Sequence, residues 1–133
     1  MAFAGMNILA ILIAAVAAFA GGAAYYMTLS KQWLAAVGIA RPNRSAAPFI
    51  ISFVALLVMA FVLAGSIGHL GPGNVSIKNG IISGAIIWAG FVATTVVVNN
   101  AYPGRKIMLS IIDSIHWLGV LVIQGAVIGA MGV

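Results

Sequence analysis

The sequence is marked first by what it lacks, because its 133 residues include no cysteine and a single acidic residue, Asp113. Without cysteine the chain can form no disulfide, no thiolate nucleophile and no cysteine-ligated metal site. Charged residues make up only 5% of the chain, whereas soluble domains average about 25%. Since so few charges could not cover the surface of a soluble fold, the composition excludes an ordinary soluble enzyme or binding domain.

Hydrophobic residues make up 64% of the chain, and they gather in four long apolar runs. A helix needs about 20 apolar residues to cross a bilayer, and each run reaches that length. None alternates apolar and polar residues as a membrane β-strand does, whereas a spanning helix satisfies its own backbone hydrogen bonds. We predict an all-α integral membrane four-helix bundle of two antiparallel hairpins. It forms a single transmembrane domain over residues 1–133, with spans at residues 3–29, 47–70, 79–98 and 107–131.

The first run resembles a signal peptide in one respect, because Ala18-Phe19-Ala20 matches a small-residue cleavage site. No lysine or arginine precedes the run, however, and its apolar residues continue beyond this point to Met27. We therefore expect this segment to stay in the protein as a membrane span.

The basic residues predict the side on which each loop lies. Loop 30–46 contains three of them and loop 101–106 contains two, whereas Lys78 is alone on the opposite side. Because cytoplasmic loops carry an excess of lysine and arginine, we expect both loops in the cytoplasm and both termini on the non-cytoplasmic side of the cell (inner) membrane. The net charge of +5 comes from no continuous basic run, so the expected partner is the lipid bilayer and not nucleic acid.

Aromatic residues gather near the predicted cytoplasmic boundary, where Trp and Tyr are enriched in membrane proteins. Three of them are expected to be interfacial: Tyr26, Trp33 and Tyr102. The stretch from Lys31 to Val37, which ends at Gly38, predicts a short interfacial helix with Trp33, Leu34 and Val37 pointing toward lipid.

Small residues at helical spacing predict where the spans pack together, because they let helix backbones approach closely. In the third span, one predicted face comprises Gly80, Ser83, Gly84, Phe91, Thr94 and Thr95. In the fourth span the glycine pair lies on a different face from Asp113, so it requires either another helix of the bundle or another protomer. A homo-oligomer, or a subunit of a larger membrane complex, is therefore expected. The predicted helix-packing glycines are Gly21, Gly80, Gly84, Gly125 and Gly129.

One group of polar residues could carry chemistry inside the membrane. Asp113 lies about 9–10 Å into the fourth span if counted from Ile107, and an ionisable group there should face protein or water and have a partner. His116 follows three residues later on the same helix face, and the hairpin geometry puts several further polar side chains on the two neighbouring spans at a similar level. The predicted intramembrane site comprises Asp113, His116, Gln124, Thr94, Thr95, Asn99 and Tyr25.

Two interpretations of this site remain open on sequence grounds. In the first, Asp113 is a structural lock that hydrogen-bonds across a structural, accessory or self-assembling membrane subunit. In the second, Asp113 and His116 serve a small proton- or cation-linked transporter, channel or sensor. We expect no cofactor and no metal, because two potential ligands fall short of a zinc or iron site. Nothing activates Ser110 or Ser114 as a nucleophile, so no catalytic residues and no enzyme activity are predicted.

Several short motifs, in their order and spacing, resemble an uncharacterised family of bacterial membrane proteins, domain of unknown function 1761. The first is the stretch from Tyr25 to Gly38, which contains Lys31 and Trp33. The later ones are Trp88-Ala89-Gly90-Phe91, the pair Asn99-Asn100, and the segment from Asp113 to His116. The resemblance covers nearly the whole chain and implies a four-span protein of about this length. It adds emphasis to five residues and supplies no reaction: Tyr25, Trp33, Asn99, Asp113 and His116.

Overall fold

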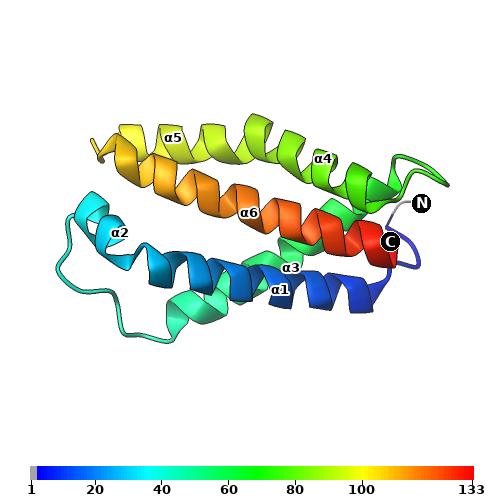
Figure 1. Ribbon diagram of the computed structural model, residues 1–133, viewed down its shortest axis with the longest axis horizontal. Coiled ribbons are helices and arrows are strands. Elements are labelled where there is room, and N and C mark those ends of the chain that lie inside the picture. The colour runs from blue at the N-terminus through cyan, green and yellow to red at the C-terminus, as the bar shows by residue number, and fades with distance from the viewer. Residues whose placement is uncertain (1–2) are drawn as a thin grey trace.

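The structure, a computed structural model, describes residues 3–133. The all-α prediction is confirmed, because these residues form helices and turns without any strand, and four helices are long and apolar enough to cross a membrane. Figure 1 shows the long helices lying side by side along the molecule, with one short helix at one end. The elements are α1 (Ile8–Thr28), α2 (Ser30–Val37), α3 (Ala47–Gly68), α4 (Ile77–Ile87), η1 (Trp88–Val92), α5 (Ala93–Ala101) and α6 (Ile107–Met131).

Side-chain capping explains where two of the four spans begin. The side chain of Asn7 accepts a hydrogen bond from the Ala10 N–H at 3.1 Å, so α1 begins at Ile8, some five residues later than the apolar run. Ser76 accepts in the same way from the Asn79 N–H at 3.2 Å, and the third span consequently begins at Ile77. Polar N-caps therefore set helix starts that hydrophobicity alone locates only approximately.

The third span runs from Ile77 to Ala101 as α4, η1 and α5, and its middle turn is a π-helix. There the Ala93 N–H bonds to the Trp88 carbonyl, five residues earlier. A π turn holds one more residue than a regular helical turn and shifts all later side chains around the axis. The expectation that Thr94 and Thr95 share the packed face of Gly80 is therefore wrong, since both threonines are exposed.

Helix α6 is the centre of the molecule, packing against α1, α3, α4, α5 and α2. Its contact with α4 is very close: a Cβ added at Gly84 would lie 2.5 Å from the Leu121 carbonyl oxygen, and one at Gly80 would overlap the backbone of Gly125. A Cβ at Gly129 would overlap the backbone of Ser76 in the same way. The predicted glycine pair of the fourth span thus packs against a second helix of the same bundle.

The remaining core lies between α1, α3 and α6. From α1 it takes mostly alanines, and the large side chains Leu9, Leu12 and Val16 point outward. The third span is the least covered, because 6% of its most apolar window is buried against 33–39% in the other three spans. Its outer surface is therefore available to lipid or to another protein.

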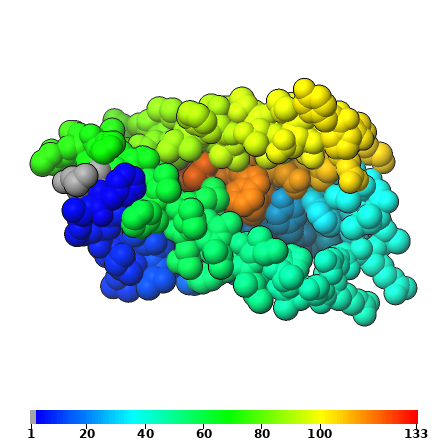
Figure 2. Space-filling model, turned by 180° about the vertical axis from the view of Figure 1, so that it is seen from behind, coloured from blue at the N-terminus to red at the C-terminus, as the bar shows by residue number. Residues whose placement is uncertain are grey.

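Helices α3 and α5 do not touch each other in the described part of the chain, although α3 packs against α1, α4 and α6. Figure 2 shows the result on the back of the molecule, where α6 is visible in orange at the bottom of a cleft between α3 and the third span. The bundle is thus closed near the α3–α4 loop and splayed near the end that carries α2.

Candidate functional site

The Asp113 carboxylate joins three helices near one end of the bundle. Its Oδ1 accepts a hydrogen bond from the Tyr26 hydroxyl at 2.6 Å and another from the Trp33 indole N–H at 3.2 Å. Tyr26 belongs to α1, Trp33 to α2 and Asp113 to α6. Because both donors are neutral, the contact is a pair of hydrogen bonds rather than an ion pair.

The chain reaches this arrangement through a break between α1 and α2. The Leu29 N–H makes the last hydrogen bond of α1, to the Tyr25 carbonyl at 3.0 Å, and Leu29 itself has non-helical φ and ψ of −101° and 19°. Helix α2 then starts at Ser30 and ends at Val37, with Gly38 as its C-cap. Gly38 has φ +85°, a left-handed conformation that favours glycine as the residue that closes a helix. The short helix predicted from the sequence is therefore present, and it lies across α6.

The expectation that Trp33 and Val37 point toward lipid is wrong. Both pack with Ala36 against Leu109 and Ile112 of α6, and the Trp33 indole also reaches Asp113. The physical reason is that a partly buried indole N–H needs a hydrogen-bond partner, and Asp113 provides one. The apolar face of α2 is thus an inner face.

The loop between α5 and α6 fastens the other end of α2. Arg105 Nη1 donates to the Val37 carbonyl at 3.1 Å, and Lys106 Nζ donates to the Ala35 carbonyl at 3.1 Å. These carbonyls belong to the last turn of α2, where cations are favoured by the helix dipole and by unpaired acceptors. Helix α2 is therefore held at its middle by Asp113 and at its end by two cations.

His116 lies one turn beyond Asp113, surrounded by aromatic rings. Its ring centroid is 4.7 Å from those of Tyr26 and Trp117. Its Nδ1 is buried and has no hydrogen-bond partner in the described residues. A Cβ added at Gly22 would lie only 2.6 Å from His116 Nε2, so Gly22 provides the space that this ring occupies on α1. This role could not be predicted from the sequence, because Gly22 lies in a run of glycines and alanines.

Tyr25 contributes to the same cluster without touching the carboxylate. Its hydroxyl donates to the Ile112 carbonyl at 2.7 Å, next to Asp113 in the chain. Tyr26, which the sequence suggested only as an interfacial residue, is instead the hydroxyl that reaches Asp113. Consecutive residues on a helix point about 100° apart, so only one of the two tyrosines can take that position.

The other predicted members of the site make no hydrogen bond to Asp113 or His116 in the described residues. Thr94 donates to the Gly90 carbonyl and Thr95 to the Phe91 carbonyl, both within their own helix, and Asn99 is exposed. Asn100, which the sequence did not single out, donates to the Ser110 hydroxyl at 3.2 Å.

Gln124 is completely buried but lies eleven residues along α6 from Asp113, about 16 Å at 1.5 Å per residue. Its Nε2 donates to the Leu56 carbonyl of α3 at 2.9 Å. It therefore links α6 to α3 in mid-bundle and is separate from the Asp113 cluster.

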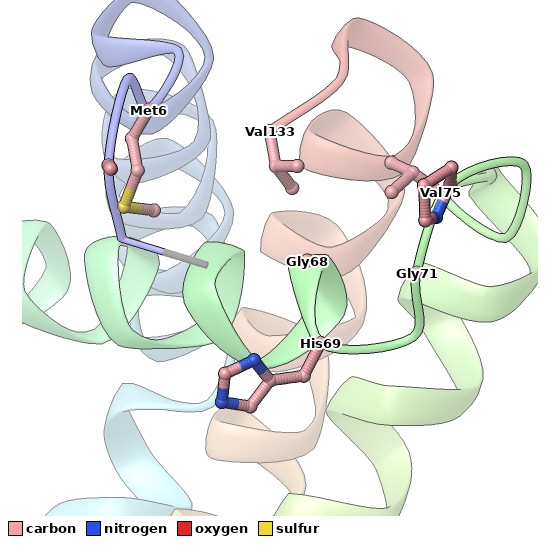
Figure 3. Close-up of a pocket in the computed structure, with 8 residues that line it drawn as sticks. Met6, Gly68, His69, Gly71, Val75 and Val133 are labelled. Carbon is pink, nitrogen blue, oxygen red and sulfur yellow. The ribbon is translucent and has the colours of Figure 1, made fainter. Parts of the chain in front are cut away.

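A hollow of about 460 Å³ opens at the opposite end of the molecule. Figure 3 shows its lining, which comes from the segment before α1, the end of α3 with the loop after it, and the C-terminal end. His69 is its one ionisable side chain, and no group of three potential metal ligands occurs in residues 3–133. The lining residues are Ala4, Met6, Gly68, His69, Gly71, Pro72, Val75 and Val133.

Comparison with known proteins gives a family and no activity. A family model described as "Protein of unknown function (DUF1761)" matches residues 9–129, which include Asp113, His116 and the side chains that contact them. No curated protein and no solved structure matches the chain. With its four membrane-length helices and its single carboxylate joining α1, α2 and α6, this chain belongs to the DUF1761 family.

Proposed function

We propose that this protein is a structural or accessory membrane-protein subunit located in the cell membrane. In it, Asp113 acts as a polar lock, a side chain that fixes helices against one another through hydrogen bonds. The observation that carries this proposal is the pair of hydrogen bonds from Tyr26 and Trp33 to one carboxylate oxygen. They use the sole acidic side chain of the protein to hold α2 against the bundle. An ionisable group inside a membrane is costly unless partnered, and here its partners are elements of the fold.

The packing supports the same function. Helices α4 and α6 meet backbone to backbone at Gly80 and Gly125, and such contacts make a rigid hairpin with little room for a substrate path. The uncovered third span is the surface through which the protein would assemble, with copies of itself or with a larger membrane complex. The glycine pair at Gly125 and Gly129 no longer argues for an oligomer, because it is used within the chain.

Two substitutions at Asp113 test the lock. Asp113→Asn keeps an oxygen acceptor for Tyr26 and Trp33, so we expect it to fold, to keep native size in detergent and to lose less than about 1 kcal/mol. Asp113→Leu leaves both donors without an acceptor and should cost about 2–3 kcal/mol. The measurement is unfolding in detergent followed by near-UV circular dichroism. Equal loss in both variants would contradict the lock.

A proton- or cation-linked transporter or sensor is the second candidate. It is favoured by one observation, the buried Nδ1 of His116 without a partner, one helical turn from Asp113. This function predicts flux or proton uptake in liposomes that Asp113→Asn abolishes while the protein remains folded. Flux that is absent from the original protein, or the same in the variant, would remove this candidate.

A further inference from the structure

We propose that the basic end of the molecule binds an anionic phospholipid. Its headgroup contacts the cations around α2 and the loop before α3, and an acyl chain lies in the cleft between α3 and the third span. This binding site is independent of the role of Asp113 and requires neither of the two functions above.

The cations at this end outnumber the acidic side chains of the protein by five to one. Five of the six basic residues are in loop 30–46 and loop 101–106, and the one acidic residue takes its hydrogen bonds from the neutral groups of Tyr26 and Trp33 rather than from these cations. Arg105 and Lys106 each donate to a neutral backbone carbonyl, which leaves their charges in place. The counter-anion must therefore come from outside the protein.

The cations also lie close to the exposed apolar ends of the spans, as residues at the depth of lipid phosphates would. Each basic segment has apolar, exposed side chains within five residues: Met27, four residues before Lys31, is 78% exposed, and Phe49, five residues after Arg44, is 61% exposed. Ile107 is 67% exposed immediately after Lys106. A boundary this sharp between apolar and cationic surface matches the boundary between acyl chains and headgroups, where each lysine or arginine contributes about 1 kcal/mol of attraction to anionic lipid.

The splayed end of the bundle gives the lipid a place for its chain. Helix α3 does not touch α5, and the cleft between α3 and the third span is floored by α6 (Figure 2). The first half of α3 is covered by exposed apolar side chains, including Ile50, Ile51 and Val54. Arg41 and Arg44 lie on the loop that leads into this half of α3. Contiguous apolar and cationic surfaces fit a phospholipid better than a soluble anion or an acidic protein.

The test measures lipid binding to the full chain in detergent by native mass spectrometry. The probes are phosphatidylglycerol and phosphatidylcholine with the same acyl chains. We expect phosphatidylglycerol to bind more tightly. The double variant Arg41→Gln/Arg44→Gln should lose about fivefold in affinity per cation, about 25-fold in all. Both arginines lie on an exposed loop, so their replacement leaves the packed interior intact.

Lys78→Gln is the matched control, because Lys78 is the one basic residue at the opposite end. Its affinity for phosphatidylglycerol should stay within twofold of the original protein. Equal binding of the two lipids, or equal loss in the control and in the double variant, would overturn the proposal. Competition by soluble glycerol phosphate at the same concentration as the lipid would overturn the assignment of the cleft, since it would show that no acyl chain is needed.

Discussion

Asp113 shows how one charge can organise a protein that has almost none. In a chain with many acidic residues, a hydrogen-bonded carboxylate would be one contact among several. Here it is the one acidic side chain, and it meets the hydroxyl of Tyr26 and the indole of Trp33. Hydrogen bonds between spanning helices contribute about 0.6 kcal/mol on average, and those to charged groups contribute about 1.5–3 kcal/mol.

Replacing Trp33 by phenylalanine should loosen α2 selectively. The change keeps an aromatic ring against α6 but removes the N–H that Asp113 accepts, so the local opening free energy should fall by about 1–2 kcal/mol. Hydrogen exchange of the α2 amides should then become roughly 5- to 30-fold faster. Trp88→Phe is the control, since it also removes an indole hydrogen bond, to the Ser114 carbonyl at 2.7 Å. If both variants leave α2 exchange unchanged, Trp33 does not fasten this helix.

At the level of residues, the sequence located the centre of the site but not its partners. Asp113 and His116 could be identified because an ionisable group is conspicuous in an apolar span. The hydrogen-bond donors could not be identified, because Trp33 reaches Asp113 only through the break between α1 and α2 at Leu29. The π turn at Trp88 likewise displaces Thr94 from its predicted face, and nothing in the apolar run Trp88–Val92 signals such a turn.

The helices themselves were easier to predict, because a bilayer permits few alternatives to a long apolar helix. The short helix α2 was also foreseeable, since its end is marked by Gly38 in a left-handed conformation. Which helix face turns inward was less certain, as the inward rotation of Trp33 shows. Amphipathic pattern alone does not distinguish a face against lipid from a face against another helix.

The contact between α4 and α6 should be sensitive to a single methyl group. A Cβ at Gly125 would overlap the backbone of Gly80, and backbone cannot move aside as a flexible side chain can. We expect Gly125→Ala to cost about 1–3 kcal/mol, as overpacking generally does. In the same helix, a Cβ at Gly119 meets nothing within 4 Å. Gly119→Ala should therefore be neutral or should stabilise by up to about 1 kcal/mol.

The two alanine variants are compared by unfolding in detergent under the same conditions. Because they make the same chemical change in one helix, differences in helix propensity cancel. A loss in Gly119→Ala as large as that in Gly125→Ala would mean that the close approach of α4 and α6 does not contribute to stability. An unchanged free energy of unfolding in both variants would mean that α4 and α6 can move apart at little cost.

At the scale of the whole molecule, the two ends are unequal. One end carries α2, five cations and the splayed part of α3, while the other is closed by the α3–α4 loop and carries Lys78. Asn7 Nδ2 also donates to the Met131 carbonyl at 3.1 Å there, which joins the start of α1 to the end of α6. Because the Asp113 cluster lies at the basic end, the orientation of the chain in the membrane also determines on which side of the membrane this cluster lies.

The absence of cysteine makes that orientation directly measurable, since any introduced thiol would be the only one in the protein. Ala40 lies on the exposed loop before α3, and Pro72 lies on the exposed loop at the other end. Because cytoplasmic loops carry the excess of positive charge, Pro72→Cys should react with a membrane-impermeant maleimide in intact cells, and Ala40→Cys should react only after the cells are permeabilised. The reverse pattern would put the α2 lock and the proposed lipid site on the outer face. Labelling of both positions in intact cells would mean that the chain inserts in two orientations. The difference of five cations against one would then be too small to determine the orientation.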